Sequence, residues 1–164
     1  VIKPEWIRTM RKDPIVFACA NPNPEIWPWE AKEAGARIVA TGRSDFPNQV
    51  NNSLGFPGLF RGIFSVQSSC INDDMCLAAS QALYRFAQKK GLSTDYIIPR
   101  MEEWQVYIDE ALAVARVAEE QNFARKKIHP LQLKKEIESI ILRAQDIVKD
   151  LVKSGYILLP RENE

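Results

Sequence analysis

The segment ATGRSDFPNQVNN, residues 40–52, joins an apolar strand to a loop rich in asparagine. The apolar run at residues 36–41 predicts a buried strand that ends where this loop begins. The same arrangement occurs upstream, where the apolar residues 15–20 precede Asn21. In an open parallel sheet, ligands bind beyond the carboxyl ends of the strands. We therefore expect Asn21, Asn51 and Asn52 to converge on one ligand pocket at this edge of the sheet.

The amide side chains at these strand ends favour a particular kind of ligand. An asparagine amide donates and accepts hydrogen bonds at once, which suits a neutral carboxamide or a hydroxy acid better than a bare cation. A structural role is equally open for each residue taken singly, because asparagine is common in turns and helix caps. Asn52, for example, could cap a helix that starts near Ser53. The shared position at neighbouring strand ends favours the ligand hypothesis.

Composition and charge limit the class of protein. The chain has 164 residues, of which 46% are hydrophobic, enough for one folded domain with a core. A formal net charge of +1 argues against a nucleic-acid partner and against a membrane surface. Three cysteines without a CxxC motif indicate a reduced, cytoplasmic compartment, and we expect Cys19 to be buried packing within its strand. The chain starts with Val1, which suggests a fragment of a longer protein.

Apolar periodicity predicts an α/β first third followed by helices. The continuous apolar strands are typical of a parallel sheet that is covered on both faces. Glycine and proline predict a broken helix at 53–62 that packs closely on its neighbours. The remaining predicted helices cover residues 4–12, 27–34, 72–91, 102–125 and 130–153. The apolar tail at 156–159 is expected to pack on the protein.

Several familiar sites are absent from the sequence. It contains no G-x-G-x-x-G, no P-loop and no H-E-x-x-H or Cys/His metal cluster. Asp73 and Asp74 are better explained by helix capping than by metal binding. His129, the only histidine, precedes Pro130 and is expected to cap a helix. Trp27 and Trp29 are expected to contribute packing rather than a stacking platform for a ligand.

Two motifs together resemble the malic enzyme family, in particular its shorter bacterial and archaeal-type members. They are DPIVFACANPNPEI at residues 13–26 and ATGRSDFPNQVNN at residues 40–52. The sequence FPG at residues 56–58 and IIP at residues 97–99 also fits this family. The resemblance covers about residues 1–125. It implies the C-terminal part of a Rossmann-type, parallel-sheet NAD(P)-binding domain, followed by α-helices.

The resemblance also implies an activity and roles for the asparagines. Malic enzymes convert L-malate to pyruvate and carbon dioxide, using NAD or NADP and Mg2+ or Mn2+. By this resemblance, Asn21 and Asn51 bind the cofactor, and Asn51 and Asn52 bind the substrate. The family's catalytic tyrosine and lysine, its acidic metal ligands and its phosphate loop have no counterpart in this sequence. We therefore expect no catalytic residue and no metal ligand here, and little activity from the chain alone.

Residues 126–164 match no part of the family that the motifs define, and a helical extension is expected there. The expected partners are malate or pyruvate, together with a second copy of the chain or the missing N-terminal part of the enzyme. Two alternatives remain open from the sequence. One is a non-catalytic interaction module that docks through the helix at 130–153, and the other is a fragment of a different Rossmann dehydrogenase.

Overall fold

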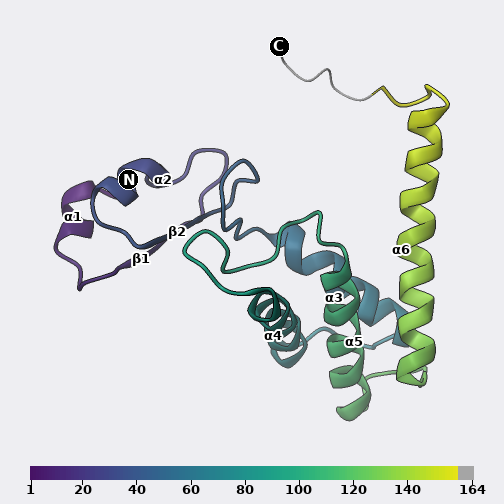
Figure 1. Ribbon diagram of the computed structural model, residues 1–164. Helices are drawn as coiled ribbons and strands as arrows, with labels where there is room; N and C mark the ends of the chain where they lie inside the picture. Colours follow the sequence, from purple (N-terminus) through teal and green to yellow (C-terminus); the bar gives the residue numbers. More distant parts are fainter. Residues whose placement is uncertain (159–164) are drawn as a thin grey trace. The chain divides into compact units, whose positions relative to one another are not determined.

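The computed structural model describes residues 1–158 (Figure 1). The chain divides into two compact units, Val1–Lys127 and a second that begins at Ile128. The elements of the first unit are α1 (Pro4–Arg8), β1 (Ile15–Ala18), α2 (Pro28–Glu33), β2 (Ile38–Thr41), α3 (Asn52–Val66), α4 (Asp73–Lys90) and α5 (Gln105–Glu120). The second unit contains α6 (Pro130–Lys153).

The predicted β-α-β unit is confirmed. Strands β1 and β2 are parallel, with Ile15 opposite Ile38 and Ala18 opposite Thr41, and α2 connects them. Parallel neighbours place both carboxyl ends at one edge. The small core of this region joins the strands to α1 and α2 through Ile7, Val16, Ala18, Ile26, Ala31, Ala34, Ala36 and Val39.

The expectation of a sheet covered on both faces is wrong for β1 within the described residues, whereas the consecutive residues Val39, Ala40 and Thr41 of β2 are all buried. Val16 and Ala18 are buried, whereas Ile15 and Phe17 are 55% and 51% exposed. Successive side chains of a strand point to opposite faces. The described residues thus bury one face of β1. The apolar side chains on its other face, Ile15 and Phe17, are not covered by any part of residues 1–158.

Helix α3 is continuous, so the predicted break between residues 53 and 62 is wrong. Pro57 lies within it, and the helix runs on past Gly62 to Val66. The close packing expected from the glycines is confirmed. A Cβ atom at Gly58 would overlap the carboxylate of Glu110, and one at Gly62 would crowd the backbone of Ala111 on α5. These glycines therefore allow α3 and α5 to approach, without breaking the helix.

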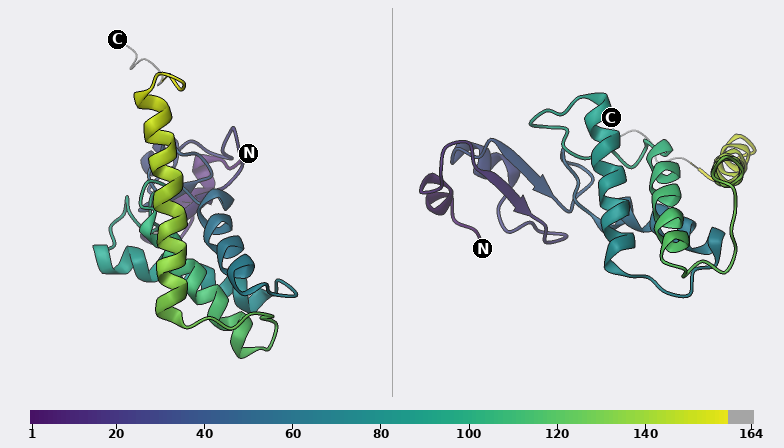
Figure 2. Two further views of the ribbon diagram at one scale, coloured as in Figure 1. Left: turned by 90° about the vertical axis from the view of Figure 1, so that its right-hand side faces the viewer. Right: turned by 90° about the horizontal axis from the view of Figure 1, so that it is seen from below.

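The other helices of the first unit begin and end at recognisable signals. Asn72 caps α4, since its Oδ1 accepts a bond from the Met75 backbone N–H at 3.1 Å, and Gly91 ends the helix with a φ of 101°. Helix α5 is shorter than predicted. Helix α5 packs against both α3 and α4, and the right-hand view of Figure 2 shows α4 and α5 side by side.

In the second unit, α6 has the predicted bounds. His129 caps it as expected, with Nδ1 accepting a bond from the Leu131 backbone N–H at 3.3 Å. The prediction that the apolar tail packs on the protein is wrong for Tyr156 and Leu158, which are 82% and 86% exposed. Leu159 lies outside the described residues. Within residues 1–158, no helix combines the length and apolar character needed to cross a membrane.

Candidate functional site

Asn48 fixes the loop that follows β2. It is buried, and its Nδ2 donates to the carbonyl oxygens of Val39 at 3.0 Å and Thr94 at 2.8 Å. Its Oδ1 accepts a bond from the Ile97 backbone N–H at 2.9 Å. Its φ of 57° is a left-handed conformation in which asparagine is enriched. The sequence carries no local signal for this role of Asn48, because two of its partners, Thr94 and Ile97, lie 46 and 49 residues downstream.

Asn51, rather than Asn52, caps α3. The Asn51 Oδ1 accepts a bond from the Ser53 backbone N–H at 3.0 Å, and its Nδ2 donates to the Gly42 carbonyl at 2.8 Å. The suggestion that Asn52 caps this helix is therefore wrong. Asn52 is the first helical residue and is exposed. The Asn51 amide retains one N–H and one oxygen lone pair with which to meet a ligand.

Asn21 and Asn51 line one pocket, and Asn52 is not part of its lining. The pocket has a volume of about 520 Å³, and the other lining residues are Gly42, Arg43, Ser44, Asp45, Gln49 and Ser53. The Asn21 amide is exposed and makes no hydrogen bond to another described residue. Gly42 permits the close approach of the two loops, because a Cβ there would lie 2.9 Å from the Cys19 carbonyl oxygen.

Arg43 joins the two loops that carry these asparagines. Its Nη1 donates to the Pro22 carbonyl at 2.8 Å, and its Nε and Nη2 donate to both carboxylate oxygens of Asp45 at 2.8 and 2.7 Å. Hydrogen bonding to Arg43 lowers the pKa of Asp45, and the same bond raises the pKa of the guanidinium. Each of the three guanidinium nitrogens of Arg43 thus donates a hydrogen bond, and the bond to Pro22 holds the Asn21 loop beside the β2 loop.

Aromatic rings surround the outer side of Arg43. Trp27 and Trp29 stack with centroids 4.9 Å apart and an interplanar angle of 9°, and Phe46 packs against both. The guanidinium carbon lies 5.5 Å from the Trp27 ring centre, within the range of a cation–π contact.

Cys19, expected to be buried, is exposed, because β1 ends one residue before it.

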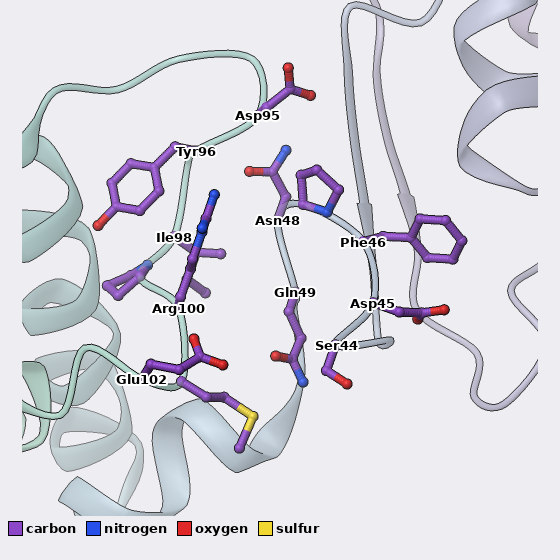
Figure 3. A pocket seen from close by; sticks show the side chains of 13 residues that line it. Ser44, Asp45, Phe46, Asn48, Gln49, Asp95, Tyr96, Ile98, Arg100 and Glu102 are labelled. Carbon is purple, nitrogen blue, oxygen red and sulfur yellow. The ribbon is translucent and has the colours of Figure 1, made fainter. Parts of the chain in front are cut away.

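A second cavity, of about 350 Å³, adjoins the first (Figure 3). Residues 44–49 and two segments after α4, 95–96 and 98–102, line it, so that it shares Ser44, Asp45 and Gln49 with the first pocket. Burial and the hydrogen bond to Glu103 raise the pKa of Tyr96 to about 12. Tyr96 therefore stays protonated at neutral pH and donates to the Glu103 Oε2 at 2.9 Å.

No group of three or more His, Cys, Asp or Glu side chains within residues 1–158 is placed to hold a metal ion.

A parallel strand pair whose carboxyl ends carry the pocket is the arrangement of a nucleotide-binding α/β domain. A family model described as "Malic enzyme, NAD binding domain" matches residues 1–120. The chain belongs to the malic enzyme family, and its α/β fold is of the Rossmann type.

Similar proteins include malic enzymes named as NAD-dependent and as NADP-dependent. The bifunctional malic/malolactic enzyme of Bacillus subtilis is 51% identical over 126 residues, covering 77% of this chain and 31% of that enzyme. The NAD-dependent malic enzyme of Geobacillus stearothermophilus is 44% identical and matches 80% of this chain, but only 27% of its own length. The NADP-dependent malic enzyme of Rhizobium meliloti is 43% identical over 78% of this chain and 19% of that enzyme. The chain thus spans about a third or less of the curated relatives it matches.

A solved structure also covers the C-terminal helix. The malic enzyme of Entamoeba histolytica matches 99% of this chain and 34% of its own length, with a TM-score of 0.95 and 48% identity. The expectation that residues 126–164 lack a family counterpart is therefore wrong, although the family model itself ends at residue 120. The NAD-dependent malic enzyme of Thermotoga maritima covers 70% of this chain and 29% of its own length, with a TM-score of 0.65 and 46% identity.

Proposed function

We propose that this chain is the C-terminal part of the NAD(P)-binding domain of a malic enzyme, a cytoplasmic enzyme that converts L-malate to pyruvate and carbon dioxide. Residues 1–125 form that part, and residues 126–164 form its helical extension. The observation that carries the proposal is the convergence of Asn21 and Asn51 on one pocket at the ends of adjacent strands. The names of the relatives include both NAD and NADP enzymes, so the proposal covers either cofactor.

The pocket chemistry fits the nicotinamide half of the cofactor. Asn21 is free to bond to the ribose or the carboxamide, and Asn51, which retains one N–H and one lone pair, lines the same pocket. When bound, the nicotinamide ring accepts a hydride from the substrate carbon. We assign the contact with malate first to Asn51. Asn52 remains a candidate on the first turn of α3, where it is exposed beside the pocket rather than within its lining.

The chain alone should bind a dinucleotide weakly and turn over no malate. The described residues bring together no metal-binding cluster, and the resemblance assigns the catalytic acid, the base and the metal ligands to segments without a counterpart here. The role of this chain is to bind and orient the reacting ring, and proximity of this kind accounts for a large part of enzymatic rate enhancement.

Dinucleotide binding and turnover can be tested separately. Titration of the chain with NADH, followed by its fluorescence, should give saturable binding that is weakened by Asn21→Ala. Asn23→Ala is the matched control, because Asn23 is exposed in the same loop and lies outside the pocket lining. A malate-dependent assay with Mn2+ should show no NAD(P)H formation. Turnover by the isolated chain would contradict the assignment of catalysis to other segments, and absence of NADH binding would contradict the proposed function itself.

A specific observation favours a second role for α6 as a docking element. Ile140, Ile147 and Leu151 follow at helical spacing and are 41%, 51% and 37% exposed. This helix would join the chain to a second copy or to the remaining part of the enzyme. Size-exclusion chromatography with light scattering tests the point, because a strict monomer at high concentration would contradict self-association.

A further inference from the structure

The larger part of the second cavity lies outside the asparagine pocket, and its walls are held in place by side chains. Asn48 ties the loop after β2 to the backbone of Thr94 and Ile97. Glu103 accepts a bond from the Arg100 backbone N–H at 2.7 Å and also pairs with Lys90. Burial raises the pKa of Glu103, but these bonds outweigh it and keep the pKa below its usual value. The cavity is therefore formed before any ligand arrives.

The charges around this cavity are unequally compensated. Asp45 is paired with Arg43 at 2.7 Å, and Asp95 is paired with Lys32 at 2.8 Å. The Arg100 guanidinium makes no hydrogen bond or ion pair with any described residue. Figure 3 shows it extending between Tyr96 and Asn48. Arg100 and Glu102 are thus the two charged side chains of the lining that make no ion pair with a described residue.

Neutral donors accompany Arg100. The Gln49 amide and the Ser44 hydroxyl also line the cavity, and neither side chain bonds to another residue of the described part of the chain. A guanidinium with an amide and a hydroxyl is suited to the oxygens of a carboxylate or a phosphate. Glu102 also lines the cavity and opposes an anion. The two charges therefore have effects of opposite sign on the binding of an anionic ligand.

We propose that this cavity is a binding site for a small anionic group, a carboxylate or a phosphate, with Arg100 as its charged partner. The cavity shares Ser44, Asp45 and Gln49 with the asparagine pocket. One ligand can therefore occupy both, with its anionic end at Arg100 and its neutral end at Asn21 and Asn51. This last statement rests on the proposed function, whereas the anion site itself does not.

The test is a titration of the full chain, labelled with 15N, followed by NMR at constant ionic strength. Succinate and inorganic phosphate are added in separate arms, with chloride as the baseline. We expect saturable shifts of backbone amides in residues 44–49 and 95–102. Arg100→Gln should weaken binding about tenfold or more, the usual range for loss of a charged hydrogen bond. Glu102→Gln should tighten it severalfold.

The control is Arg116→Gln, since Arg116 is exposed on α5, pairs with Glu120 at 2.7 Å and lies outside the cavity lining. A response to succinate alone identifies a carboxylate site, and a response to phosphate alone identifies a phosphate site. Shifts no larger than those with chloride, or equal affinities in wild type and Arg100→Gln, would overturn the proposal.

Because the Arg100 side chain is exposed and bonds to no described residue, its substitution should leave the fold intact. A parallel NADH titration reports on the proposed function separately: anion binding at Arg100 without NADH binding would leave the site standing and remove its link to the dinucleotide.

Discussion

Asn48 and Glu110 are both buried polar side chains, but they differ in their bonding. Asn48 is 5% exposed, and its side chain makes three hydrogen bonds, one to Val39 of β2 and two that join the β2 loop to the segment after α4. Glu110 on α5 is 0% exposed, and neither of its carboxylate oxygens has a hydrogen-bond partner among the described residues. The first arrangement positions a site. The second places a titratable group in the seam between α3 and α5.

The surroundings of Glu110 explain its protonation. It faces Gly55 and Gly58 of α3, where any larger residue at 58 would overlap its carboxylate. Burial raises the pKa of Glu110 to about 8, and the nearby Gly58 backbone offsets only part of this rise. The side chain is therefore mostly neutral at pH 7. A buried polar group therefore fixes geometry when its hydrogen bonds are made, and a buried titratable group without them makes stability depend on pH.

Asn48→Ala should have the largest effect on stability. It removes three hydrogen bonds and leaves the Val39 and Thr94 carbonyls and the Ile97 N–H without that partner. We expect the free energy of unfolding to fall by about 3 kcal/mol, at roughly 1 kcal/mol for each bond. Urea denaturation measures it. A loss below about 1 kcal/mol would show that this amide does not hold the two segments together.

Glu110→Gln should change how stability depends on pH. Since the pKa rises from 4.5 to about 8 on folding, the folded state binds more protons between these values, and wild-type stability must fall as pH rises through this window. Relative to Glu110→Gln, the wild type should lose about 2 kcal/mol between pH 6 and pH 8. Denaturation at several pH values measures the difference, in which the other titrating groups cancel. Parallel curves for the two proteins would mean that Glu110 has a partner in solution.

Asn51→Ala should have an intermediate effect. It removes the cap of α3 and the bond to the Gly42 carbonyl. Loss of such a cap typically costs about 1 kcal/mol. Asn52→Ala is the control, because this neighbouring amide is exposed and caps nothing. Thermal unfolding of the two variants side by side would decide whether Asn51 or Asn52 carries the structural role.

Asn21→Ala should have the smallest effect on stability. Its amide is exposed and bonds to no other described residue, so we expect a change within about 0.5 kcal/mol. Asn48 would then stabilise the fold, whereas Asn21 would contribute little to stability and remain available to a ligand. A larger loss in urea denaturation would place Asn21 among the structural residues.

Local signals explain what could be predicted from sequence. Prolines and caps marked α6 between His129 and Ser154, and Asn72 and Gly91 marked α4, so that these helices were predicted closely. The β-α-β unit followed from its apolar runs, and the family followed from the two asparagine motifs.

Long-range contacts explain what could not be predicted. Gly58 and Gly62 resemble helix breakers locally, but their role is to admit α5, which lies some 50 residues later in the chain. Asn48 is one polar residue of a loop until Thr94 and Ile97 are placed beside it. The cavity at Arg100 likewise joins two segments that are distant in sequence. The residue pattern of a single segment contains no information about such pairs.

The stack of Trp27 on Trp29 gives the loop region a marker of its own. Each indole lies over the other, nearly parallel, and the Arg43 guanidinium lies near the Trp27 ring. Ring currents in such an arrangement move the resonances of the facing protons to high field. Arg43 also donates a hydrogen bond to the Pro22 carbonyl in the loop that contains Asn21. The chemical shifts of the Arg43 protons can therefore report the native placement of this loop in an unlabelled sample.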